Sequence, residues 1–168
     1  MSSHALKSWC DWLAATAASQ RIQSTEWIIP ATQTVHILAV AAVLTSALII
    51  DLRLLGLLWR DQPVDAVIRR LAPFIWWPLP LLAATGSTLI VAEPARALLN
   101  PVFYLKMGLL VAAAGVTLSC QMPLRRDARF WERSTARYRG ARLMALASLP
   151  LWVGVVFAGR WIAYVQGS

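Results

Sequence analysis

The sequence predicts an all-α integral membrane protein: a four-helix bundle with an N-terminal amphipathic helix lying at the membrane interface. Three observations lead to this fold class. Hydrophobic residues make up 58% of the 168 positions and charged residues only 14%, whereas about a quarter of the residues in soluble domains are charged. The mean hydropathy is +0.57. The nine Trp fit a bilayer, whose interfaces favour Trp and Tyr. This composition argues against a soluble globular enzyme.

Four stretches are long and apolar enough to cross a bilayer, which takes about 20 residues of helix. The predicted spans are residues 27–50, 71–92, 99–123 and 143–165. Pro73, Pro78 and Pro80 should bend the second span or delay its start. Residues 8–19 have apolar positions at helical spacing but are too short and too polar to span, so they are the predicted interfacial helix. We expect residues 1–168 to form a single membrane domain.

Positive charge is distributed unevenly between the connections. The first and third connections between the predicted spans are rich in Arg, whereas the segments on the other side of the bundle carry three basic residues, Lys7, Arg21 and Arg96. Cytoplasmic loops hold the excess of Lys and Arg, so we expect a multi-pass protein of the bacterial inner membrane with both termini on the periplasmic side. The bilayer is then the partner of these charges, and no aromatic-basic pattern suggests nucleic acid. The cytoplasmic connections carry eleven Arg: Arg53, Arg60, Arg69, Arg70, Arg125, Arg126, Arg129, Arg133, Arg137, Arg139 and Arg142.

Small residues recur at helical spacing in two of the spans. Small side chains let helix backbones approach closely in lipid, so we expect both stripes to be packing surfaces between helices. The stripes are Gly108, Ala112, Gly115 and Ser119 in the third span, and Gly154 and Ala158 in the fourth.

Three ionisable residues lie inside the predicted spans, where such residues are costly and are functional candidates. His36 should lie about 13 Å and Lys106 about 8 Å from the outer surface, at 1.5 Å per residue. Arg160 lies near the outer end of the fourth span. All three are therefore predicted in the outer leaflet, although they come from three different helices.

This set of side chains suits haem b. A neutral imidazole is a good axial ligand for haem iron, which makes His36 the first candidate ligand. A lysine amine ligates only when it is deprotonated, a form that burial favours, so Lys106 is the second candidate. The planar fork of Arg160 could pair with a propionate. Gly86 could let the macrocycle lie against backbone, and a porphyrin slot is expected beside Ala39, Val40, Val43 and Ala47.

Each of these residues also has an interpretation without a cofactor. His36 could hydrogen-bond a neighbouring helix, and Lys106 and Arg160 could extend along their aliphatic stems to the headgroups. Asp51 and Arg53, at the inner end of the first span, are expected to be structural ion-pair partners rather than catalysts.

Two motifs resemble a family of small, uncharacterised bacterial four-helix membrane proteins. The first is His36 followed by DLRLLG at residues 51–56, and the second is the pattern NPxFxxK at residues 100–106. More distantly, the chain is similar to membrane protoporphyrinogen oxidases of the HemJ type and to CopD-like copper-resistance membrane domains. The HemJ resemblance implies haem b, with His36 and Lys106 as the important pair.

The same resemblance leaves the activity open. The first span ends in Asp51-Leu52-Arg53, where the HemJ-type enzymes have Pro-Arg-Leu. Copper handling would call for clusters of soft Met, Cys and His ligands, and the four Met, two Cys and two His form no cluster in the sequence.

The leading hypothesis is therefore a b-type haem protein of membrane electron transfer or redox chemistry, with a redox protein or a quinone as its partner. Oxidation of a porphyrinogen, which would make the chain a membrane oxidoreductase, is one alternative. A cofactor-free structural subunit or small-molecule transporter is another. A homo-oligomer is compatible with all three.

The predicted topology can be measured with reporter fusions. A reporter fused after Ser168 should be active on the outer face, and one inserted near Arg133 should be active in the cytoplasm, because the Arg-rich connections define the inner side. A cytoplasmic signal from the Ser168 fusion would remove the shared depth of His36, Lys106 and Arg160.

Overall fold

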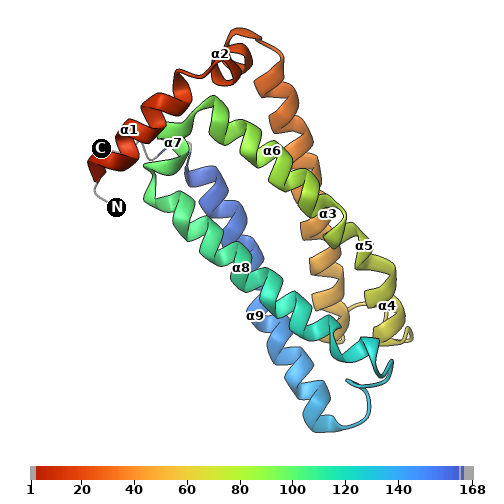
Figure 1. The fold of residues 1–168 in the computed structure, drawn as a ribbon. Coiled ribbons are helices and arrows are strands. Elements are labelled where there is room, and N and C mark those ends of the chain that lie inside the picture. Colours follow the sequence, from red (N-terminus) through yellow and green to blue (C-terminus); the bar gives the residue numbers. More distant parts are fainter. Residues whose placement is uncertain (1–2, 163, 165–168) are drawn as a thin grey trace.

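A computed structural model describes residues 3–162 and 164, and all regular structure in this part of the chain is helical (Figure 1). The all-α prediction is confirmed. The helices are α1 (Ser3–Ala14), α2 (Ala17–Ser24), α3 (Ile28–Leu54), α4 (Val64–Leu71), α5 (Pro73–Trp76), α6 (Pro78–Ala92), α7 (Pro94–Leu98), α8 (Pro101–Gln121), the 3-10 turn η1 (Pro123–Arg125) and α9 (Thr135–Trp161).

Among residues 3–162 and 164, four helical segments are long and apolar enough to cross a membrane, as predicted: Ile28–Leu54, Val64–Ala92, Pro101–Arg125 and Thr135–Trp161. The fourth begins eight residues before the predicted 143, because the Ser134 hydroxyl caps α9 by accepting a bond from the backbone N–H of Arg137. The cap makes part of the Arg-rich connection helical. The predicted end of this span, residue 165, lies outside the described residues.

Prolines interrupt the second span instead of delaying its start. The helix already begins at Val64 and is divided into α4, α5 and α6, with Pro73 and Pro78 at the first positions of α5 and α6. Proline lacks the N–H that would continue a helix but suits the first turn of a new one. The three pieces follow one another along the bundle (Figure 1).

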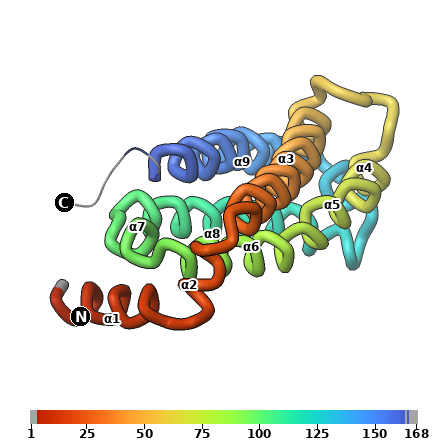
Figure 2. Tube along the Cα trace, turned by 90° about the horizontal axis from the view of Figure 1, so that it is seen from above, coloured from red at the N-terminus to blue at the C-terminus, as the bar shows by residue number. Residues whose placement is uncertain are grey.

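The N-terminal region contains two helices where one was predicted over residues 8–19. The Thr16 hydroxyl accepts a bond from the Ser19 N–H and starts α2 after a break, because this cap favours a new helix over continuation of α1. Helix α1 packs on α7, and its Cys10 side chain is buried. In Figure 2, α1 lies beside α7 and α6 at the end of the bundle where α3 begins.

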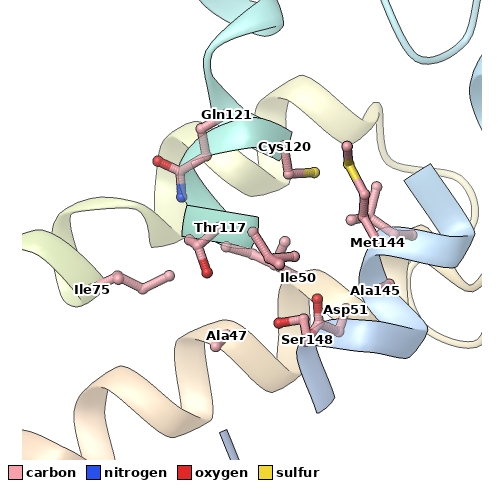
Figure 3. Close-up of a pocket in the computed structure, with 12 residues that line it drawn as sticks. Ala47, Ile50, Asp51, Ile75, Thr117, Cys120, Gln121, Met144, Ala145 and Ser148 are labelled. Carbon is pink, nitrogen blue, oxygen red and sulfur yellow. The ribbon is translucent and has the colours of Figure 1, made fainter. Parts of the chain in front are cut away.

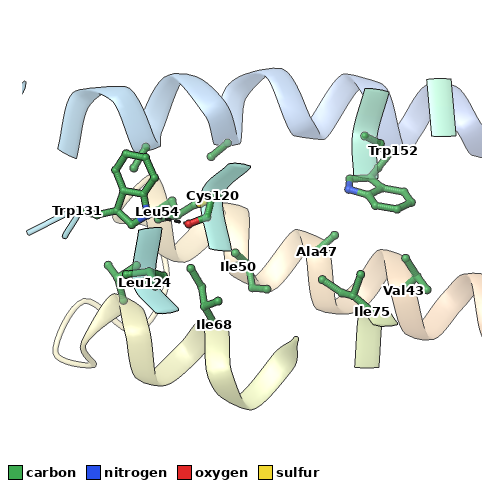
Figure 4. Packing of buried hydrophobic residues seen from close by; sticks show 14 residues of the cluster. Val43, Ala47, Ile50, Leu54, Ile68, Ile75, Cys120, Leu124, Trp131 and Trp152 are labelled. Carbon is green, nitrogen blue, oxygen red and sulfur yellow. Dashed lines mark hydrogen bonds between the residues drawn. The ribbon is translucent and has the colours of Figure 1, made fainter. Parts of the chain in front are cut away.

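The spans associate as two pairs that share one core. Helix α8 packs along α9, α6 packs along α3, and α3 contacts α9 to join the pairs. The core is densest near the end of the bundle where α3 ends and α9 begins, and Figure 4 shows this packing. Its members include Val43, Ala47, Ile50, Leu54, Ile68, Ile75, Cys120, Leu124, Trp131 and Trp152.

The two predicted small-residue stripes behave differently. Gly108, Ala112, Gly115 and Ser119 all face outward on α8, so their expected role in packing the bundle is wrong for the described chain. The reason is that α8 turns its opposite side, with the fully buried Ala113, toward the core. On α9 the prediction is confirmed: a Cβ at Gly154 would lie 3.2 Å from Leu109, and Ala158 is buried.

Side chains from distant segments bond to the last carbonyls of three helices. A helix leaves its final carbonyl groups without intrahelical donors, and these donors join each helix end to another part of the chain. The bonds run from Gln23 Nε2 to the Ala92 carbonyl of α6 (2.7 Å), from Trp131 Nε1 to the Cys120 carbonyl of α8 (2.9 Å), and from Asn100 Nδ2 to the Ile162 carbonyl after α9 (3.3 Å).

Replacement of Trp131 by Phe should destabilise the protein. The substitution keeps an aromatic ring but leaves the buried Cys120 carbonyl without its donor, which costs about 1–3 kcal/mol. Trp77→Phe is the matched control, because Trp77 is 80% exposed on the lipid-facing surface. Thermal unfolding in detergent measures the difference. Equal unfolding temperatures for the two variants would contradict the capping role of Trp131.

Candidate functional site

His36 lies on α3, half-buried, with its imidazole turned toward α6. Its Nδ1 is 2.7 Å from Oγ1 of Thr85, a buried residue of α6. The Thr85 hydroxyl donates its single hydrogen to the Leu81 carbonyl, at 2.8 Å. It must therefore accept from the imidazole, which assigns the proton to Nδ1. The Nε2 lone pair is left available, without a hydrogen-bond partner among the described residues.

Gly86 contacts the same imidazole. A Cβ built on Gly86 would lie 3.8 Å from His36 Cε1, so the ring of the histidine itself packs against this part of α6. Gly86 was expected to receive a macrocycle, and the structure instead places the His36 side chain beside it.

Lys106 lies on α8 and packs on the facing helix α9. A Cβ on Gly159 would be 3.6 Å from Lys106 Cε and 3.7 Å from Nζ, so the lysine side chain lies against this part of α9. Asn100 fixes this pairing of helices: its Oδ1 caps α8 at Val102, and its Nδ2 reaches the end of α9. No ion pair or hydrogen bond of Lys106 occurs within residues 3–162 and 164.

His36 and Lys106 each pack against a neighbouring helix, whereas Arg160 is exposed at the same end of the bundle. The start of α3, the end of α6, the start of α8 and the end of α9 lie at the same end of the bundle (Figure 1). Arg160 is exposed and bonds instead to Tyr164, with Nη2 2.8 Å from the hydroxyl and the guanidinium over the ring.

The face of α3 on which an apolar slot was expected packs against the bundle itself. Ala39, Val43 and Ala47 are all buried, and Val43 and Ala47 belong to the main core. This face of α3 points toward the other helices, and its small side chains pack against them. Haem binding beside His36 stays a prediction.

A second polar group lies on α3 near its other end. The Asp51 carboxyl is 5% exposed and accepts a hydrogen bond from Ser148 of α9. The expected ion pair between Asp51 and Arg53 is not formed. Residues two apart on a helix face different directions, and Arg53 instead donates to the Gln62 carbonyl and lies 3.8 Å from Glu132.

Four apolar spans with polar groups between them define a multi-pass helical membrane protein. Residues 11–165 match the model of a family of unknown function, DUF6644, and the chain belongs to that family. Its membership of an uncharacterised family is thus confirmed. No curated protein and no solved structure matches the chain, so no HemJ-type or CopD-like relative is found.

Proposed function

We propose that this protein binds haem b in the membrane and acts in electron transfer or redox chemistry, with His36 as an axial ligand. The observation that carries the proposal is the free Nε2 of His36, on an imidazole whose other nitrogen is held by Thr85. Histidine ligands of metals characteristically donate their second ring N–H to a fixed acceptor, which sets the tautomer and the ring orientation. Thr85 supplies that acceptor from the neighbouring helix.

The available side chains suit haem better than a bare metal ion. In the described part of the chain, no three His, Cys, Asp or Glu side chains come together as a ligand group. A porphyrin brings four nitrogen ligands of its own, so the protein has to add only one or two axial ligands. His36 meets this requirement, and Lys106 is the second residue that could.

Lys106 would be the second ligand in its neutral form. No carboxylate pairs with the amine among the described residues, so no salt bridge holds it protonated, and burial against α9 favours the neutral state. Arg160 lies at the same end of the bundle on an exposed side chain, where it could exchange Tyr164 for a propionate. When bound, haem iron would supply one-electron chemistry.

The resemblance to HemJ-type oxidases supports the same pair, His36 and Lys106, and makes oxidation of a porphyrinogen the alternative activity. A redox protein or a quinone is the proposed electron partner. The Arg-rich connections support an inner-membrane location with both termini in the periplasm.

A cofactor-free structural subunit or transporter is the second candidate. The His36–Thr85 bond favours it, because a histidine that only joins two helices would make the same contact. The two candidates differ in what His36 Nε2 binds, and spectroscopy of histidine variants separates them.

Replacement of His36 by Ala should remove most of the haem. The two histidines of the chain provide a matched pair, since His4 is exposed on α1 outside the spans. We expect wild type and His4→Ala to purify with a Soret band, and His36→Ala to insert normally with at least a tenfold lower haem content, since second-shell losses alone reach 10–100-fold. The measurement is the haem-to-protein ratio in detergent. Equal haem content in both variants, or none in wild type, would rule out the proposal.

Lys106 variants test the second ligand. Lys106→Met offers a thioether and should keep haem with a shifted spectrum and a higher potential, since Met ligation raises it. Lys106→Arg keeps the charge but cannot ligate, because guanidinium stays protonated, so it should lose the wild-type spectrum. A lysine that only reaches toward headgroups predicts the reverse, with Arg tolerated. Unchanged oxidised and reduced spectra of Lys106→Arg would show that Lys106 is no ligand.

A further inference from the structure

A small cavity lies between α3, α5, α8 and α9, toward the end of the bundle opposite to His36. Its volume is about 20 Å³, and a site for one buried water takes about 10–15 Å³ on this measure. Figure 3 shows Asp51 and Ser148 side by side, with Thr117 of α8 across from them and Gln121 farther along α8. The remaining lining residues are mostly apolar.

The Gln121 amide has a defined orientation. The indole Nε1 of Trp76 donates to Gln121 Oε1 at 2.8 Å, and an indole can only donate. The oxygen therefore faces Trp76, and the amide nitrogen, Nε2, cannot bond to the indole. This Nε2 is buried and has no hydrogen-bond partner in the described chain. It is a donor that requires an acceptor inside the bundle.

The Asp51 carboxyl also has a buried atom without a hydrogen-bond partner. Ser148 bonds to the carboxyl group, but Oδ2 is buried without a partner. Arg53, the nearest cation along the chain, is engaged with Gln62 and Glu132, and no described Lys or Arg pairs with Asp51. A carboxylate without a countercharge in an apolar interior is very costly and is normally neutralised by a proton.

We propose that Asp51 is a proton-binding site: its carboxyl is neutral at physiological pH and shares one buried water with Gln121. The carboxyl O–H at Oδ2 and the Gln121 amide both donate to the water oxygen. The water donates in turn to Thr117 Oγ1, whose own hydrogen is used on the Ala113 carbonyl. The two buried atoms of the lining without a partner, Asp51 Oδ2 and Gln121 Nε2, then each have one.

The donor set selects a proton over a metal cation. A sodium ion would need oxygen ligands on all sides, and the fixed Gln121 amide turns its N–H groups toward the cavity. Cys120 of α8 is the other titratable residue in the lining, and neither α5 nor α9 adds a charged group to it. Arg53 and Glu132 do not line the cavity, and each charge has the other as its ion-pair partner. Asp51 is thus the group that holds the proton.

Infrared spectroscopy of the reconstituted protein tests this site. At neutral pH, wild type should show the carbonyl stretch of a protonated carboxyl, with a downshift in D₂O. Asp51→Asn should lack this band. Asp61→Asn, which alters an exposed aspartate in the loop after α3, should retain it. Absence of the band in wild type would show that Asp51 is ionised, and loss of the band on replacing KCl with NaCl would show a cation site. Either result overturns the proposal.

Gln121→Leu keeps Asp51 and provides the test if Asp51→Asn fails to fold. This variant removes the amide that helps to hold the water, so the band should persist at a shifted frequency. An unchanged frequency would contradict the shared water. The proposal does not depend on haem, and His36→Ala should show the wild-type band whether or not it binds haem.

Discussion

Hydrogen bonding in an apolar environment is the constraint on which this structure depends. Lipid supplies no donors or acceptors, so each polar group in a span needs a partner from the protein. The Ala92, Cys120 and Ile162 carbonyls find donors on other segments, which fixes how the helix ends meet. Pro73 and Pro78 of the second span are accommodated because each starts a new helix at a position where no N–H is required.

The same constraint separates the two polar sites of α3. At His36, the Thr85 hydroxyl accepts a hydrogen bond from Nδ1–H, and the lone pair of Nε2 stays free. This arrangement suits a ligand that arrives from outside the chain. At Asp51, the carboxyl Oδ2 and the Gln121 amide line a cavity and remain unpartnered, an arrangement suited to a water and a proton. The two sites lie toward opposite ends of one helix, so a single span carries both candidate functions.

Part of the candidate site could be predicted from the sequence. His36 and Lys106 are exceptional in apolar spans, and their depths follow from counting residues, so their location at one end of the bundle was predictable. Thr85 was not identified, because a Thr in a span commonly bonds to its own helix and only the packing of α3 on α6 brings it to the imidazole. Gly159 was missed for a similar reason: its role depends on how α9 faces α8.

The sequence alone determined the class of the protein, the number of spans and the residues whose burial demands an explanation, because hydropathy, length and charge act locally along the chain. Tertiary structure decided the rotation of each helix about its axis. That rotation turned the small residues of α8 outward, buried Ala39, Val43 and Ala47 of α3, and directed Arg53 to Glu132 instead of Asp51. The spans have no marked hydrophobic side, since lipid and core are both apolar, so only side-chain packing and the few available hydrogen bonds could choose which face is buried.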